Sequence, residues 1–130
     1  MIVCDTHALI FDALAPDRLG TQAARAISSS RRSGSLACAD ISLWEIAMLM
    51  EKGRLKVDLP PTEFLAALIS GGGFQVLPIT PIIAAIATSA QVAPGDPADR
   101  LIAATALVHG APLVTQDRRL TDQPGLETIW

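Results

Sequence analysis

The segment at residues 96–117 constrains the fold of this chain more than any other stretch. It opens with Asp96 and Pro97, a pair typical of a helix start with Asp as the capping residue and Pro at the first helical position. Residues 101–108 are apolar with one exception, which predicts a deeply buried helix, and a glycine turn then leads to a buried strand at 112–115. One acid therefore begins a helix and another follows a strand. In open α/β sheets such positions meet at the carboxyl edge, where ligand sites lie.

Apolar runs that predict strands alternate with helical patterns along the whole chain. The predicted strands are at 1–4, 35–39, 74–79, 112–115 and 126–130. The predicted helices are at 6–14, 20–32, 42–52, 61–70, 80–90 and 96–108. This alternation predicts an α/β fold with a central parallel sheet of about five strands and helices on both faces. We expect the 130 residues to form a single domain, 1–130.

The composition excludes several classes of protein. Half of the residues are hydrophobic, so the chain can bury a core and is not predicted to be disordered. No apolar stretch is long and continuous enough for a membrane span, and no signal-peptide pattern is visible. Cys4 and Cys38 fit no zinc-binding spacing, so we expect core thiols in a cytoplasmic protein. A net charge of −3 is not that of a general nucleic-acid-binding protein.

Four acidic residues follow a predicted strand or open a helix, namely Asp5, Glu45, Asp99 and Asp117. Each has an ordinary structural alternative. Asp5 could simply cap a helix, and Glu45 could close a capping box with Ser42. Asp99 could complement a helix dipole, and Asp117 could be a turn residue. Right-handed crossovers, however, bring all four positions to one edge of a parallel sheet, so we expect them to lie together.

Carboxylates gathered at one edge repel one another, and their burial is costly unless a cation compensates them. Oxygen ligands without Cys or His favour Mg²⁺ or Mn²⁺ over zinc. We expect Asp5, Asp99 and Asp117 to hold the metal, and Glu45 to act with them in catalysis. The reaction that such a metal site predicts is hydrolysis of a phosphodiester bond.

Neighbouring side chains would complete this site. The hydroxyls of Thr6 and Thr115 would orient a carboxylate or the attacking water, although both are also ordinary β-branched residues at strand ends. Setting the four acids aside leaves 9 acidic against 10 basic residues, so the remaining surface need not repel RNA. Three arginines beside the proposed site are expected to contact phosphates: Arg100, Arg118 and Arg119. We expect them to bind short single-stranded or loop RNA rather than a long duplex.

Five segments, in this order, resemble the PIN domain, and specifically the VapC-type toxin ribonucleases of prokaryotic toxin–antitoxin pairs. They are VCDTHALI at 3–10, ISLWEIAMLMEKGRL at 41–55, LPIT at 77–80, DPADRLIAATAL at 96–107 and LVTQDRRL at 113–120. The resemblance implies a PIN-like, Rossmann-like parallel sheet with helices on both faces. It also implies Mg²⁺- or Mn²⁺-dependent endoribonuclease activity in a homodimer that a cognate antitoxin inhibits.

The resemblance assigns the acidic residues of the family to the same four positions. Asp96 would be an auxiliary acid or a helix cap, and we favour the cap. The chain departs from many relatives at Gly95, where they carry a histidine. In this family the antitoxin packs along apolar helix surfaces near the site, and the contacts expected here are Trp44, Met48 and Leu49.

Two other functions are alternatives to the ribonuclease. A receiver-like regulatory module also gathers acids at a sheet edge, but it needs an acidic pair after the first strand and a lysine near the end. This chain has a single Asp5 there, and its only lysines are Lys52 and Lys56. A non-catalytic PIN fold that only binds a partner is the other alternative, against which the intact set of acids argues.

Overall fold

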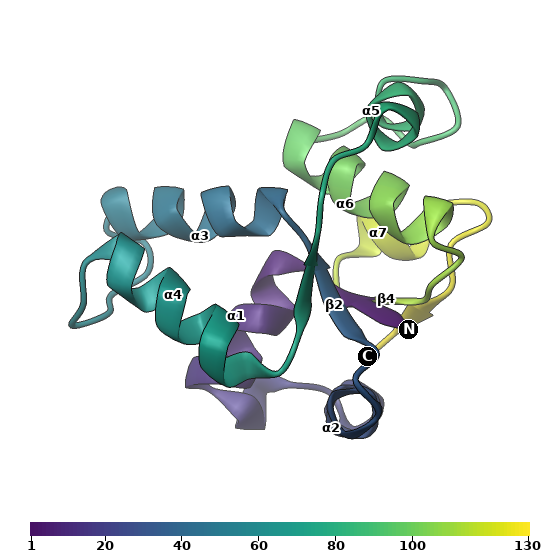
Figure 1. The fold of residues 1–130 in the computed structure, drawn as a ribbon. Coiled ribbons are helices and arrows are strands. Elements are labelled where there is room, and N and C mark those ends of the chain that lie inside the picture. The colour runs from purple at the N-terminus through teal and green to yellow at the C-terminus, as the bar shows by residue number, and fades with distance from the viewer.

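The computed structural model describes all residues of the chain, 1–130 (Figure 1). A five-stranded sheet with the order β3-β2-β1-β4-β5 forms its centre, and every neighbouring pair of strands is parallel. The strands are β1 (Ile2–Cys4), β2 (Leu36–Ala39), β3 (Gln75–Leu77), β4 (Leu113–Val114) and β5 (Thr128–Ile129). The α-helices are α1 (Thr6–Leu14), α2 (Thr21–Ser33), α3 (Ile41–Glu51), α4 (Pro61–Gly72), α5 (Pro81–Ala87), α6 (Pro97–Val108) and α7 (Arg118–Thr121), with a 3₁₀ turn, η1, at Pro16–Arg18.

Helices cover both faces of the sheet, as the alternation of elements predicts. Because successive side chains of a strand point to opposite faces, the strands contribute alternately to two cores. Cys4 and Cys38 belong to the core shared with α1, α2, α3 and α4. Val3 and Ala37 belong to the core shared with α5, α6 and α7 (Figure 1). Both cysteines are buried free thiols, in agreement with the expectation of core residues.

The strand order creates a switch point between β1 and β4. From β1 the chain builds outward to β2 and β3 on one side, and it returns to place β4 and β5 on the other side. The loops that leave β1 and β4 therefore diverge above the same edge. In open α/β sheets this divergence opens a crevice at the carboxyl ends of the strands.

Element boundaries follow the local signals, with small departures. α4 continues beyond the predicted end and stops at Gly73, whose φ of 64° lies in the left-handed region that favours glycine. α5 ends at Ala87, earlier than predicted, and the Thr88 hydroxyl that follows is shared between the carbonyls of Ala84 and Ala85 in the last turn. None of the helices combines the length and the apolar character that a membrane crossing requires.

Candidate metal centre and active site

The carboxyl edge of the sheet is hollowed at the switch point into a cleft of about 600 Å³, which we call the acidic cleft. Its wall comes from the starts of α1, α6 and α7 and from one face of α3. All four acids predicted for the site line it, together with one more, so that its carboxylates are Asp5, Glu45, Asp96, Asp99 and Asp117. The structure thus brings together side chains from four separate segments of the chain.

Asp5 combines a structural and a functional position. Its backbone N–H donates to the Val114 carbonyl at 3.0 Å, and its carboxylate accepts from the Ala8 N–H at 2.7 Å, so it caps α1 as well as following β1. The residue is only 8% exposed. Burial raises the pKa of Asp5, and Asp117 raises it further, whereas Thr115, the Ala8 amide and His7 lower it. The cap therefore holds an acid that is costly to ionise without a nearby cation.

The capping box predicted for Ser42 and Glu45 is wrong. α3 begins at Ile41 with Asp40 at the N-cap position, and the Asp40 carboxylate instead accepts from the Ile79 N–H at 3.0 Å. Because the helix starts two residues earlier than the motif requires, Ser42 lies inside the first turn, fully buried, and faces α1. Ser42 and Glu45 therefore take part in a contact between α3 and α1 and do not cap the start of α3.

That contact runs through Thr6. The Thr6 hydroxyl donates to Glu45 Oε1 at 2.5 Å and lies 3.0 Å from Ser42 Oγ. Because its single proton is engaged by Glu45, Ser42 is placed to donate to Thr6. Burial raises the pKa of Glu45, and Asp99 and Asp96 raise it further, while the hydrogen bond from Thr6 lowers it. Two buried hydroxyls thus fix the direction in which Glu45 points.

The start of α6 supplies two further carboxylates. Asp96 caps the helix by accepting from the Asp99 N–H at 3.4 Å, which confirms the predicted cap. Carboxylate oxygens of Glu45, Asp96 and Asp99 also lie within 4.8 Å of one another. This trio shares only Asp99 with the predicted one, so Asp96 belongs to the acidic cluster as well as to the cap. Burial raises the pKa of Asp99, and the charges of Asp117 and Asp96 add to that rise.

Asp117 is positioned by the turn that leaves β4. Thr115 is fully buried, and its hydroxyl accepts from the Asp117 N–H at 3.1 Å. The Asp117 carboxylate accepts from the Arg119 N–H at 3.0 Å, and its Oδ1 lies 3.6 Å from Arg119 Nε. Thr115 therefore orders the loop that carries Asp117, and its hydroxyl also lowers the pKa of Asp5.

The three predicted phosphate-binding arginines have different surroundings. The Arg100 guanidinium donates to the backbone carbonyls of Ala87, Ser89 and Ala93, at 2.7, 2.8 and 3.0 Å. It holds the loop between α5 and α6, so the RNA contact predicted for it is replaced by a structural role. Arg118 is exposed outside the acidic cleft, whereas Arg119 lines the cleft.

Two basic residues of the cleft, Lys52 and Arg54, were missed by the sequence prediction. Lys52 stands seven residues after Glu45, a spacing that returns to the same face of a helix and could have indicated it. Arg54 lies in a segment for which no element was predicted. The expected antitoxin contacts, Trp44, Met48 and Leu49, also line the cleft.

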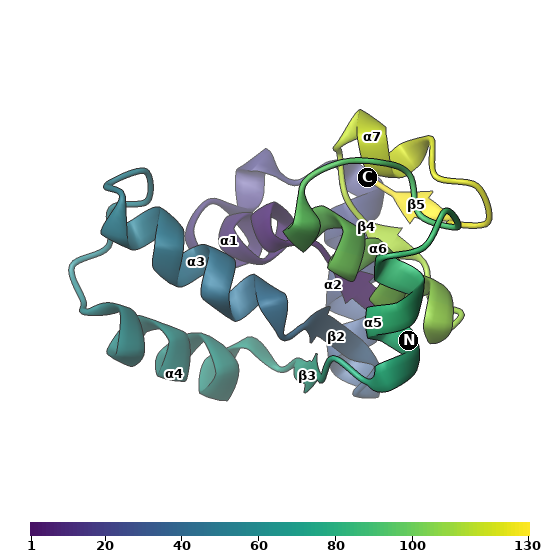
Figure 2. The same ribbon diagram turned by 90° about the horizontal axis from the view of Figure 1, so that it is seen from above.

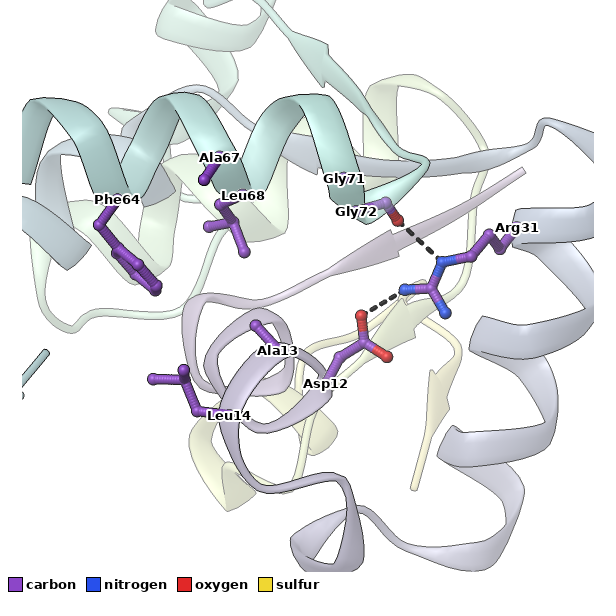
Figure 3. Close-up of a pocket in the computed structure, with 9 residues that line it drawn as sticks. All are labelled: Asp12, Ala13, Leu14, Arg31, Phe64, Ala67, Leu68, Gly71 and Gly72. Carbon is purple, nitrogen blue, oxygen red and sulfur yellow. Dashed lines mark hydrogen bonds and ion pairs between the residues drawn. The ribbon is translucent and has the colours of Figure 1, made fainter. Parts of the chain in front are cut away.

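A second hollow, of about 450 Å³, lies between α1 and α4 (Figure 3). Its one carboxylate, Asp12, forms an ion pair with Arg31, whose Nε also donates to the Gly72 carbonyl at 2.8 Å. The acid of this α1–α4 hollow is therefore already neutralised. The acidic cleft, in contrast, holds five carboxylates and a single intrachain ion pair, that of Asp117 with Arg119. The acidic cleft is the hollow whose donor set fits a divalent cation.

Comparisons with known proteins agree with this geometry. The PIN domain family model matches residues 2–126. Ribonuclease VapC22 of Mycobacterium tuberculosis (strain ATCC 25618 / H37Rv) is 39% identical over 132 residues, which cover 99% of this chain and 98% of that protein.

Two solved structures share the fold at lower identity. A chain of VapBC2 from Rickettsia felis, bound to a DNA fragment from its promoter, is 16% identical with a TM-score of 0.70, over 98% of this chain and 97% of that one. A chain of a toxin–antitoxin complex from Klebsiella pneumoniae is 21% identical with a TM-score of 0.64, over 97% and 95% of the two chains. The sheet, the convergent acids, the family model and the full-length relative lead to one conclusion: the chain belongs to the PIN domain family, among its VapC-type ribonucleases.

Proposed function

We propose that this protein is a Mg²⁺- or Mn²⁺-dependent endoribonuclease that acts as the toxin of a VapBC-type toxin–antitoxin pair. The observation that carries the proposal is the convergence of five carboxylates from four segments in one cleft at the switch point of the sheet. The 39% identity to a ribonuclease over nearly the whole of both chains supports RNA as the substrate.

The residues present fit a divalent metal. Three carboxylate groups, those of Glu45, Asp96 and Asp99, can offer oxygens within 4.8 Å of one another, a donor set that suits Mg²⁺ or Mn²⁺. Asp5 and Asp117 line the same cleft and remain proposed ligands with Asp99. A bound ion would supply Lewis-acid chemistry, activating a water and stabilising the charge that develops on a phosphodiester.

The protein's own groups would orient this chemistry. The Ala8 amide and the Thr115 hydroxyl hold the Asp5 carboxylate, and the Thr6 hydroxyl holds Glu45 in the direction of the cleft. Arg119 is 69% exposed at the side chain beside Asp117, so it can turn toward a phosphate of the substrate. The carboxylates of Asp5, Glu45 and Asp117 thus each accept a hydrogen bond that orients them before the substrate arrives, whereas the Asp99 carboxylate has no such partner within the chain.

The proposed partners are a cognate antitoxin and, for the active form, a second copy of this chain. The two solved structures named above, which share this fold, are of a toxin–antitoxin complex and of VapBC2, and this supports the first of these partners. Trp44, Met48 and Leu49 remain the proposed antitoxin contacts. Trp44 is 57% exposed, as a contact residue must be.

Cleavage of single-stranded RNA with and without metal tests the function. Wild-type protein is expected to cut RNA with Mg²⁺ or Mn²⁺ and to stop when EDTA is added. Asp5→Asn is expected to lower the rate by at least about a hundredfold, since losing a ligand should exceed the effect of losing a supporting contact.

The control is Asp58→Asn, which removes one exposed carboxylate outside the acidic cleft and should leave the rate unchanged. Circular dichroism would verify that both variants are folded. Full activity in folded Asp5→Asn, or undiminished cleavage in EDTA, would reject the proposed mechanism.

A further inference from the structure

The acidic cleft continues beyond its acids along α3. Past Glu45, the lining residues on this side contain no acid: they are Trp44, Met48, Leu49, Lys52 and Arg54. We call four of these, Trp44, Met48, Lys52 and Arg54, the α3 subsite. In both ribbon views α3 extends from the end of β2 away from the sheet (Figure 1 and Figure 2).

The spacing along α3 separates the acidic and basic ends of this wall. Glu45 and Met48 lie on α3, and Lys52 is its C-cap residue; their spacing of three and four residues keeps them on one side of the helix. Seven residues at about 1.5 Å each put the backbone of Lys52 about 10 Å along the axis from Glu45. This separation places Lys52 for a phosphate next to the one that reacts at the acids, on the same strand.

The side chains of the α3 subsite have no partner within the chain that would explain them. Lys52 and Arg54 are exposed, and neither takes part in an intrachain ion pair. Trp44 leaves 57% of its surface exposed beside them, although burial of its ring would be favourable. In a protein of net charge −3, two free cations and an exposed indole are thus gathered next to the carboxylates.

We propose that the α3 subsite binds the single-stranded RNA on one side of the scissile bond, with Lys52 and Arg54 on the phosphates and Trp44 stacked on an unpaired base. The inference rests on the proposed function, because a strand held at the acids must leave the cleft along one of its walls. Cations that follow a backbone and an aromatic platform for a base are the two features that single-strand binding uses.

This assignment competes with the antitoxin contact proposed for Trp44, Met48 and Leu49. A protein partner would be expected to engage the apolar side chains and gain little from Lys52 and Arg54. Lys52 and Arg54 line the same cleft as the carboxylates that are proposed to hydrolyse RNA, and this favours RNA as the ligand of the subsite. A stacked base must also be unpaired, so the subsite selects single strands over duplex.

The test is binding of a short fluorescein-labelled RNA to folded Asp5→Asn protein, which the proposed function makes inert, followed by fluorescence anisotropy. Lys52→Gln with Arg54→Gln is expected to reduce the slope of log affinity against log salt by about 1.4, for two single-strand phosphate contacts. Trp44→Ala should weaken binding by about fivefold to a hundredfold with an unchanged slope. Trp44→Phe should retain most of the affinity.

The matched control removes two exposed cations outside the acidic cleft, with Lys56→Gln and Arg25→Gln, and should leave the affinity near that of the parent. In otherwise wild-type protein with metal, the α3 subsite variants should raise KM for single-stranded RNA and leave kcat nearly unchanged. The same RNA annealed to its complement should bind more weakly and be insensitive to Trp44→Ala.

Two outcomes separate this inference from the proposed function. If wild-type protein cuts RNA with metal while the subsite variants bind and cut like the parent, the inference is overturned and this wall belongs to a protein partner. If wild-type protein neither binds nor cuts RNA, the proposed function itself fails. Loss of binding that is equal for single-stranded and duplex RNA would also overturn the stacking role of Trp44.

Discussion

The two hollows of this molecule differ in whether a cation of the chain compensates their carboxylates. In the α1–α4 hollow, Asp12 is paired with Arg31, and the same guanidinium donates to the end of α4 through the Gly72 carbonyl (Figure 3). In the acidic cleft, burial and mutual repulsion raise the pKa values of Asp5, Glu45 and Asp99. In the α1–α4 hollow the carboxylate takes part in an ion pair that links α1 to α2. In the acidic cleft most carboxylates have no cation of the chain beside them.

The difference indicates what each hollow is for. A compensated acid contributes to stability whether or not anything binds, because its partner is part of the chain. An uncompensated cluster lowers stability until a cation arrives, so its retention is explained by function.

The largest expected effect is that of metal on stability. Adding Mg²⁺ or Mn²⁺ to EDTA-treated protein should raise the free energy of unfolding by about 2.7 kcal/mol at a hundredfold excess over the dissociation constant. Asp12→Asn should respond like wild type, whereas Asp99→Asn should respond much less, because only Asp99 lies in the acidic cluster. Urea unfolding with and without metal measures the shift. An equal response of Asp99→Asn and wild type would break the contrast.

The next effect is that of the hydroxyl that holds Glu45. Thr6→Val keeps the shape of the side chain but removes the donor to Glu45 Oε1, and it is expected to lower metal affinity or activity roughly tenfold to a hundredfold. Thr6→Ser keeps the hydroxyl and serves as the matched control, with a result near wild type. Metal titration followed by RNA cleavage gives both values. If Thr6→Val and Thr6→Ser behave alike, the hydroxyl has no positioning role.

A smaller effect is expected from the paired acid. Asp12→Asn removes one charge of an ion pair whose side chains are 20% and 35% exposed, so the loss of stability should be up to about 1 kcal/mol, with RNA cleavage unchanged. In EDTA at neutral pH, Asp99→Asn should be at least as stable as wild type, since it relieves repulsion. Opposite signs for the two Asp-to-Asn changes would establish the contrast. Destabilisation in both would show that the acidic cluster is compensated after all.

Part of this arrangement could be predicted from the sequence because local rules determine it. The sequence signals that end β1 at Cys4 and begin α6 at Pro97 also place Asp5 just after a strand and Asp99 in the first turn of a helix. Parallel topology and right-handed crossovers then bring those acids to one edge. Nothing beyond local sequence and the handedness of crossovers is needed for that step.

The rest depended on contacts that the sequence does not specify. The spacing of Ser42 and Glu45 fits a capping box and a contact with Thr6 equally well, and only the start of α3 decides between them. Arg100 is adjacent to Asp99 in sequence, but the path of the loop between α5 and α6 turns its guanidinium to backbone carbonyls. Arg54 joins the acidic cleft from a segment without regular structure, which no periodic pattern could place.

The most direct measure of the contrast is the pH dependence of the metal-free protein. Burial, together with the charge of Asp117, raises the pKa of Asp5 in the folded state above its unfolded value. The folded chain then binds a proton that the unfolded chain releases, so the free energy of unfolding should fall as pH rises through the window between the two pKa values. The slope contributed by each such acid is at most about 1.4 kcal/mol per pH unit.

Urea unfolding in EDTA from about pH 4 to neutral pH should show this fall in wild type and in Asp58→Asn, and a shallower one in Asp5→Asn. A profile that Asp5→Asn leaves unchanged would mean that Asp5 is as well compensated as Asp12, and the distinction between the two hollows would be lost.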